Sequence, residues 1–198
     1  MYEIRTEKNR LRKKYKELRE SLAVSEKAKL DERICNRFMS LVSYRFADTL
    51  LLYAPIKGEI DIRPIAMAAL SAGKRVAFPR CIPESSKMQF HFVNSLDELA
   101  PASYGIPEPS SDAPVFDKNN KHSRESCICL IPALIYDKRG YRVGYGKGYY
   151  DRYLADFNGT KVGIIYNSCV IDTLPHGRYD LKVDFTVSER GVNIINEN

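Results

Sequence analysis

Two short apolar runs in residues 48–80, separated by a segment of helical character, constrain the fold more than any other part of the chain. The runs are "DTLLLYAP" and "KRVAFPR". Between them, "DIRPIAMAALSAGK" has Asp61 as a candidate helix cap, an alanine-rich body and a closing glycine, Gly73. Continuous apolar runs are typical of strands covered on both faces. A strand, a crossover helix and a second strand therefore predict two neighbouring parallel strands.

The rest of the chain extends this pattern. "KMQFHFV" alternates like an edge strand, "CICLIPALIYD" reads as a buried strand, and "KVGIIYN", "DFTVS" and "VNII" are expected to complete the sheet. Residues 95–126 are rich in proline and polar residues and predict a long surface loop. We predict an α/β fold, a three-layer α/β/α sandwich with a mostly parallel central sheet, formed as one domain over residues 1–198.

Residues 1–45 are expected to form two helices packed on this core. Residues 5–22 place Leu11, Tyr15, Leu18 and Leu22 on one face. A second helix is expected over residues 25–44, with Ser25 as its cap and Leu30, Ile34, Phe38 and Leu41 pointing inward. Lys8 and Arg12 project together at the edge of the buried stripe, so each is either a solvated cation or reaches into a cleft.

The net charge of +6 comes from this N-terminal segment. Residues 1–45 carry 13 Lys and Arg against 7 Asp and Glu, and residues 46–198 carry 18 of each. A surface for binding nucleic acid is not what this distribution predicts, although a local anion site remains open. The charged N-terminus has no apolar core for a signal peptide, and no apolar run approaches the roughly 20 residues that span a bilayer, so we expect a cytoplasmic protein with no membrane partner.

The five cysteines are scattered, and no C-x-x-C motif occurs. Cys127 and Cys129 lie two residues apart in an apolar strand-like run, which places both on one face. A buried structural pair is favoured over a zinc or redox site, because three histidines offer little to complete a metal centre.

A glycine-rich loop follows the "CICLIPALIYD" strand, in the stretch "GYRVGYGKGYYDRYL". The spacing of Gly144, Gly146 and Gly148 matches neither G-x-G-x-x-G nor the P-loop pattern. Nevertheless, a strand that leads through glycines into a helix directs backbone amides and the positive helix end toward an anion. Arg142 and Lys147 add charges suited to phosphate oxygens. The sequence therefore predicts a phosphate cradle here.

Three residues at the start of the following helix have two interpretations each. Asp151 either stabilises the helix dipole or, beside a phosphate cradle, binds Mg²⁺. Tyr149 and Tyr150 either pack against the core or frame a flat ligand above the loop.

The stretch "IPALIYDKRGYRVGYGKGYYDRYL" resembles the signature of 5-formyltetrahydrofolate cyclo-ligases, also called 5,10-methenyltetrahydrofolate synthetases. Four further segments, "KNRLRKKYKELR", "YAPIKGEIDIRPI", "YGIPEP" and "LKVDFTVSERGV", also resemble this family and occur in the same order. The resemblance covers almost the whole chain. It departs at Tyr145, where glycine or a basic residue is common, and in residues 110–126, which match no family segment.

The resemblance implies that the protein uses ATP and Mg²⁺ to convert 5-formyltetrahydrofolate into 5,10-methenyltetrahydrofolate, releasing ADP and phosphate. Asp151 and Asp184 would be the Mg²⁺ ligands. Tyr150, Arg142 and Lys147 would be catalytic. The residues that would bind ATP are Lys8, Asn9, Arg10, Leu11, Arg12, Arg142, Val143, Gly144, Tyr145, Gly146, Lys147, Gly148, Tyr149 and Tyr150.

The folate would be bound by Ala54, Glu59, Tyr104, Tyr149 and Tyr150. Glu59 suits the pterin, whose 2-amino group and ring N–H present two parallel donors to a carboxylate. Without the resemblance, Glu59 would be a charge near a helix N-terminus. The expected partners are small molecules and the expected state is a monomer. The alternative functions are an ATP-independent sugar-phosphate isomerase or acyl-group enzyme on a similar fold, and a nucleic-acid binder that uses the basic first helix.

Overall fold

The computed structural model describes residues 2–85, 87–102, 105–119 and 126–195. The helices are α1 (Tyr2–Glu20), α2 (Val24–Met39), α3 (Val42–Phe46), α4 (Arg63–Ser71) and α5 (Tyr149–Leu154). The strands are β1 (Thr49–Leu51), β2 (Arg75–Ile82), β3 (Lys87–Val93), β4 (Ala100–Pro101), β5 (Pro107–Glu108), β6 (Cys127–Pro132), β7 (Ile135–Asp137), β8 (Arg142–Val143), β9 (Thr160–Ile164), β10 (Val170–Ile171), β11 (Phe185–Val187) and β12 (Val192–Ile194).

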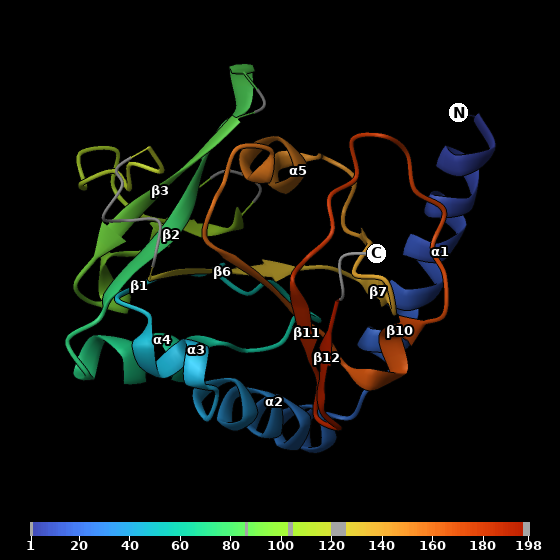
Figure 1. The fold of residues 1–198 in the computed structure, drawn as a ribbon, viewed down its shortest axis with the longest axis horizontal. Helices are drawn as coiled ribbons and strands as arrows, with labels where there is room; N and C mark the ends of the chain where they lie inside the picture. The colour runs from blue at the N-terminus through green and yellow to red at the C-terminus, as the bar shows by residue number, and fades with distance from the viewer. Residues whose placement is uncertain (1, 86, 103–104, 120–125, 196–198) are drawn as a thin grey trace.

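The main sheet has seven strands in the order β12-β11-β9-β6-β1-β2-β3. Its five inner strands pair in parallel, and the edge strands β3 and β12 are antiparallel to their neighbours. Helices α2, α3 and α4 lie below the sheet, whereas α5 lies above it (Figure 1). The expected three-layer α/β sandwich with a mostly parallel sheet is confirmed, including the parallel β1 and β2 and the edge position of β3.

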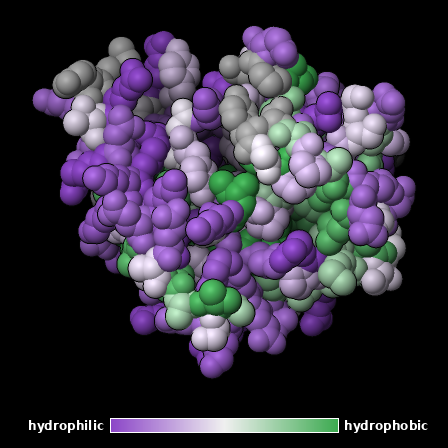
Figure 2. Space-filling view, turned by 180° about the vertical axis from the view of Figure 1, so that it is seen from behind, coloured by the Kyte–Doolittle hydropathy of each residue, from purple (hydrophilic) through white to green (hydrophobic). Residues whose placement is uncertain are grey.

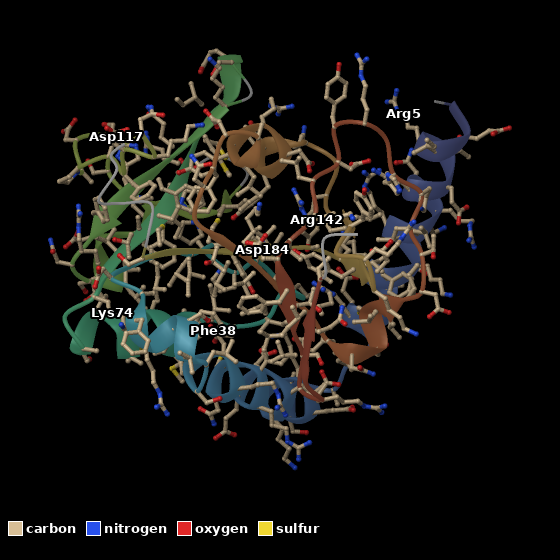
Figure 3. All side chains as sticks on the ribbon, in the orientation of Figure 1. Arg5, Phe38, Lys74, Asp117, Arg142 and Asp184 are labelled. Atoms are coloured by element: carbon tan, nitrogen blue, oxygen red, sulfur yellow. The ribbon has the colours of Figure 1, made fainter. Side chains whose placement is uncertain are left out.

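The core lies between these layers. All three residues of β1 are buried, and so are Cys127 and Cys129 on β6, which are free thiols. Leu11 and Tyr15 of α1 join the same cluster as Ile34 and Phe38 of α2, and Phe38 is labelled beneath the sheet in Figure 3. Leu18, expected to face inward, is 37% exposed, whereas the adjacent Arg19 is buried, so the inward face of α1 passes through Arg19 rather than Leu18.

Three local expectations are corrected. The helix expected over residues 25–44 is two helices, because Leu41 is extended and caps α3. Ser25 is inside α2, whose cap is Ala23 with no side-chain hydrogen bond. Ile62 caps α4, although the Asp61 carboxylate still accepts the Arg63 N–H at 3.1 Å.

The region expected to be a long loop also contains regular structure. Strands β4 and β5 pair with each other, and His91 of β3 forms an isolated bridge with Val115. None of the described helices is long and apolar enough to cross a membrane.

Candidate active site

A cavity of about 520 Å³ opens at the carboxyl ends of β1 and β6. Ligand sites of parallel sheets are typically found at this edge. The cavity collects residues from α1, from the loops that follow β1 and β8, and from the β2–β3 hairpin. Many of the candidate residues from the sequence line it: Lys8, Arg12, Ala54, Glu59, Arg142, Val143, Gly144, Tyr145, Gly146, Lys147, Gly148, Tyr149, Tyr150 and Asp151.

Four candidates do not line the cavity, and a fifth lies outside the described residues. Leu11 is buried in the core, because it is on the apolar side of α1. Arg10 points to solvent and pairs with Glu7, and Asn9 is exposed and accepts a hydrogen bond from Arg12. Asp184 is the fourth, and Tyr104 is the candidate that the structure does not describe.

The backbone of the glycine loop depends on two left-handed residues. Gly146 has a φ of +94° and Gly148, the cap of α5, has a φ of +69°. Glycine adopts this region without the steric penalty that other residues meet. A Cβ atom on Gly146 would also lie 3.2 Å from Cζ of Arg12. The glycine therefore permits both the turn and the close approach of an arginine from α1.

Arg12 reaches the glycine loop from α1, and Lys8 reaches the cavity wall, as the cleft alternative required. Arg12 Nε donates to the carbonyl oxygen of Gly144 at 2.8 Å, and Lys8 Nζ lies 2.6 Å from the Asp180 carboxylate. Both cations are partly buried at the cavity wall. The side of the molecule opposite to Figure 1 shows a predominantly hydrophilic surface where α1 lies (Figure 2). The basic surplus of this helix therefore includes cations placed at the cavity.

Arg142 and Asp151 form an ion pair inside the cavity. Arg142 Nη2 lies 2.8 Å from Oδ1 of Asp151, and the Arg142 side chain is 6% exposed. The Arg142 Nη1 group donates to the carbonyl of Leu181. Oδ2 of Asp151 has no hydrogen-bond partner among the described residues, so one carboxylate oxygen remains for a ligand.

Asp184 lies at the start of β11, outside the cavity lining. Its carboxylate accepts the backbone N–H of Lys161 at 2.7 Å and lies 3.4 Å from Lys161 Nζ. Asp184 and Arg142 are both labelled in Figure 3. The segments that carry them are joined by a hydrogen bond from the Val183 N–H to the carbonyl of Gly140. Asp180, rather than Asp184, lines the cavity together with Asp151.

Sequence reasoning missed two charged residues near the cavity, although helpful signals were present. Asp180 opens "DLKVD", the segment from which only Asp184 was selected. Arg19 follows Lys8, Arg12 and Tyr15 at steps of four and three residues, so all four share one face of α1. The apolar wall from the β2–β3 hairpin, which includes Met88, was also missed, because an edge strand gives no sign of what it faces.

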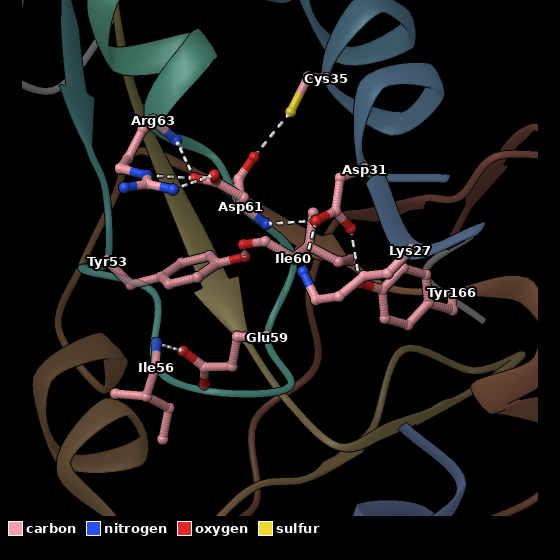
Figure 4. Close-up of polar contacts among 10 residues, drawn as sticks. All are labelled: Lys27, Asp31, Cys35, Tyr53, Ile56, Glu59, Ile60, Asp61, Arg63 and Tyr166. Carbon is pink, nitrogen blue, oxygen red and sulfur yellow. Dashed lines mark hydrogen bonds and ion pairs between the residues drawn. The ribbon is translucent and has the colours of Figure 1, made fainter. Parts of the chain in front are cut away.

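Glu59 is a buried carboxylate on the loop that follows β1. Its side chain is 6% exposed, and Oε2 accepts the Ile56 N–H at 3.0 Å (Figure 4). Burial disfavours the charged form and raises the pKa of Glu59 to about 7. Oε1 has no hydrogen-bond partner in the described part of the chain. The carboxylate therefore has an oxygen available to accept hydrogen bonds from a ligand.

The loop that carries Glu59 is held by Tyr53, from the same loop, and by Asp31 of α2 (Figure 4). Tyr53 donates to the carbonyl of Ile60 at 3.0 Å, and Asp31 of α2 accepts the Asp61 N–H at 3.1 Å. Asp31 also accepts hydrogen bonds from Tyr166 and from Lys27, both at 2.5 Å. These contacts hold the backbone on the C-terminal side of Glu59 in one position.

We expect Asp31→Asn to destabilise the protein by about 3 kcal/mol, because breaking a buried charge network leaves its partners without a counter-charge. Urea unfolding at pH 7 measures this change. Asp156→Asn is the matched control, since Asp156 also pairs with a lysine, Lys118, but is exposed. The control is expected to cost less than about 1 kcal/mol. Equal losses in both variants would contradict a structural role specific to Asp31.

Tyr150, in the first turn of α5, is partly buried against the core. Its hydroxyl is inaccessible and has no hydrogen-bond partner in the described part of the chain. Burial raises the pKa of Tyr150 well above its ordinary value, so the phenol is neutral. Tyr145 is 42% exposed at the cavity mouth. An unpaired buried hydroxyl on a cavity wall suits a polar contact with a ligand.

Comparisons with known proteins agree with one another. The family model described as "5-formyltetrahydrofolate cyclo-ligase family" matches residues 4–189. The NMR structure of a 5,10-methenyltetrahydrofolate synthetase from Aquifex aeolicus is 31% identical, with a TM-score of 0.83, and the alignment covers 96% of this chain and 94% of that one. The synthetase structure from Mycoplasma pneumoniae is 27% identical, with a TM-score of 0.73, over 92% and 98% of the two chains. A 5-formyltetrahydrofolate cyclo-ligase from Escherichia coli K12 is 25% identical over 86% of this chain and 93% of its own length.

Proposed function

The chain belongs to the 5-formyltetrahydrofolate cyclo-ligase family, and we propose that it catalyses the ATP-dependent closure of 5-formyltetrahydrofolate to 5,10-methenyltetrahydrofolate, with release of ADP and phosphate. The observation that carries this proposal is the composition of the cavity. A glycine loop with cations from α1 forms one wall, and the buried carboxylate of Glu59 forms another. One wall suits a triphosphate, and the other suits the donor edge of a pterin.

The proposed reaction has two steps in which atoms and charge balance. The formyl oxygen attacks the γ-phosphorus of ATP, the bond to ADP breaks, and an iminium phosphate forms at N5. N10 then attacks the activated carbon and loses its proton, and the C–O bond breaks to release phosphate. The protein forms no covalent bond to substrate in this scheme, so its contribution is positioning and stabilisation of charge.

The residues divide between these tasks. Lys8, Arg12 and Lys147 line the phosphate side of the cavity and would balance negative charge on the triphosphate. Arg142 would hold Asp151 in position through their ion pair. Tyr150 would contact the formyl or N10 region with its unpaired hydroxyl. Tyr149 and Ala54 would line the folate side.

The carboxylates at the cavity fit a Mg²⁺ ion, which prefers one or two carboxylates together with phosphate oxygens. Asp151 would be one ligand, with Oδ2 available. Family resemblance selects Asp184 as the second, whereas the cavity lining favours Asp180. When bound, Mg²⁺ would neutralise charge on the phosphates.

The test of the function is the growth of the methenyl chromophore in the near ultraviolet. Purified protein with 5-formyltetrahydrofolate, ATP and Mg²⁺ is expected to give that signal, and reactions without ATP or without Mg²⁺ are expected to give none. A flat trace from folded protein that binds ATP would refute the folate assignment while keeping the nucleotide site.

Asparagine variants decide which carboxylates bind the metal. Asp151→Asn is expected to raise the Mg²⁺ concentration for half-maximal activity by about tenfold or more, because a charged ligand is lost. If the cavity geometry is decisive, Asp180→Asn behaves similarly and Asp184→Asn changes the requirement less than about threefold. The reverse order would assign the second site to Asp184. Mg²⁺ titrations at saturating ATP measure all three.

We further propose a cytoplasmic monomer. The five cysteines are all free thiols, which suits a reducing compartment. Residues of a single chain also supply both the phosphate wall and the carboxylate wall of the cavity. Gel filtration coupled to light scattering tests the monomeric state.

A further inference from the structure

Arg19 is a buried arginine that the proposed mechanism leaves unused. It lies on the same face of α1 as Lys8 and Arg12, and the residue is 4% exposed. Its Nη2 group donates to the carbonyl of Ala133 at 2.5 Å, and its guanidinium lies 5.5 Å from the ring centre of Tyr166. No carboxylate of the described residues forms an ion pair with it. Buried guanidinium groups usually have such a partner.

The Arg19 guanidinium also has an unused donor. Its Nε–H is inaccessible and has no acceptor among the described residues. A guanidinium offers five N–H donors, and buried donors are nearly always paired. A buried cation with an unpaired N–H indicates a position where a ligand supplies the acceptor.

The surroundings of Arg19 connect this donor to Glu59. Arg19 lines a second cavity, of about 590 Å³, and this cavity shares Ala54, Ile56 and Glu59 with the first one. A Cβ atom on Gly58 would lie 3.9 Å from Cβ of Arg19, so α1 passes directly beside the Glu59 loop. The positive charge of Arg19 also acts to lower the pKa of Glu59 against the larger effect of burial. Glu59 therefore stands where the two cavities meet, and Arg19 lies on the wall of the second cavity.

A reduced pterin presents a matching edge. Its 2-amino group and N3–H are donors, and the adjacent 4-oxo group is an acceptor. A carboxylate accepts from the two donors, but it repels the oxo group, so complete recognition needs a neighbouring donor. Resting on the proposed folate function, we propose that Arg19 is a specificity-determining residue that donates to the 4-oxo group while Glu59 accepts from the 2-amino and N3 positions.

This assignment orients the substrate. The recognition edge of the pterin faces Glu59 and Arg19, where the two cavities meet. N5 and its formyl group, on the other ring, then project toward the glycine loop and Tyr150 in the first cavity.

The test compares two ligands across the same variants. Isothermal titration without ATP measures the affinity of 5-formyltetrahydrofolate and of its 4-amino analogue, in which a donor replaces the 4-oxo acceptor. The variant is Arg19→Gln, whose amide can still donate to Ala133, with Arg19→Lys as a second variant that retains the charge. Arg63→Met is the matched control, because Arg63 lines the second cavity but its guanidinium already donates two hydrogen bonds to the Asp61 carboxylate. Thermal unfolding confirms that each protein is folded.

We expect Arg19→Gln to lower the affinity for the 4-oxo ligand by about tenfold or more, because losing a hydrogen bond from a charged donor reduces binding by about that factor. The affinity for the 4-amino ligand is expected to fall by less than about twofold. Arg63→Met is expected to leave the preference unchanged. If the Arg19 variants lose affinity equally for both ligands and have a lowered Tm, the role of Arg19 is structural, through its hydrogen bond to Ala133, and the proposal is overturned. Unchanged affinity for the 4-oxo ligand would also overturn it. A wild-type protein that binds neither ligand would instead refute the folate function.

Discussion

Glu59→Gln is expected to make the protein more stable above pH 7 and, at the same time, to remove most of its activity. The pKa of Glu59 is raised from its ordinary 4.5 to about 7, because the side chain is buried. Folding above pH 7 must therefore keep a carboxylate ionised in an apolar setting. The difference between the two pKa values corresponds to about 3 kcal/mol, which is an upper limit because the new amide N–H is itself unpaired.

The direction of the pH dependence follows from the raised pKa. Below about pH 4.5 the carboxyl is neutral in both the folded and the unfolded protein, and its titration costs nothing. Between 4.5 and about 7 the unfolded chain loses the proton first, so the contribution of Glu59 to the free energy of unfolding falls as pH rises. The stability difference between Glu59→Gln and wild type should therefore increase over this interval and then level off.

Activity should change in the opposite direction. Replacing the carboxylate by an amide substitutes a donor for one acceptor and removes the charge that would strengthen both proposed pterin hydrogen bonds. We expect kcat/KM for the folate to fall by about 100-fold or more, with the KM for ATP nearly unchanged.

Urea unfolding from pH 4 to 9 and chromophore kinetics at pH 8 measure these two effects. Glu108→Gln is the stability control, because Glu108 is equally buried but has Arg80 at 3.8 Å and the Cys81 N–H at 3.2 Å as partners. That variant should lose stability at pH 8. A Glu59→Gln protein that is less stable than wild type at pH 8 would contradict the cost attributed to keeping the buried Glu59 carboxylate ionised.

Local patterns in the sequence predicted the layered fold well. The run that contains β1 is apolar on both faces because the strand is covered above and below, and Gly73 ends α4 with a φ of +75°. The break between α2 and α3 was not predictable from periodicity, because Ser40 and Leu41 are both compatible with a helix, whereas Leu41 is extended in the structure.

The candidate site was predictable where one segment carries several of its residues. The glycine loop contributes Arg142 through Asp151 to the cavity as one continuous stretch. Residues brought together from distant segments were harder to select. Asp180 meets Lys8 across 172 positions of sequence, and Asp31 reaches the Glu59 loop through hydrogen bonds whose partners lie on other elements. No spacing rule connects such pairs, because the tertiary fold determines them.

Gly146→Ala is expected to weaken ATP binding by about 100-fold and to lower the free energy of unfolding by about 1–2 kcal/mol. Alanine at a φ of +94° is strained by about 1–2 kcal/mol, and its Cβ would lie 3.2 Å from the Arg12 guanidinium carbon. Arg12 then has to leave the carbonyl of Gly144, a hydrogen bond of a charged donor worth about 1.5–3 kcal/mol. The loss of the Arg12 contact acts mainly on the loop that would bind the triphosphate, and the expected 100-fold corresponds to about 2.7 kcal/mol.

Gly73→Ala separates backbone strain from the loss of the arginine contact. Gly73 has a φ of +75° at the end of α4, but a Cβ atom there meets nothing within 4 Å. This control should lose about 1 kcal/mol of stability and keep its affinity for ATP, measured by titration calorimetry. If both variants bind ATP as wild type does, the close approach of Arg12 to Gly146 has no part in forming the cradle. If only Gly146→Ala is impaired, the turn and the arginine from α1 act as one unit, and the basic first helix belongs to the nucleotide site.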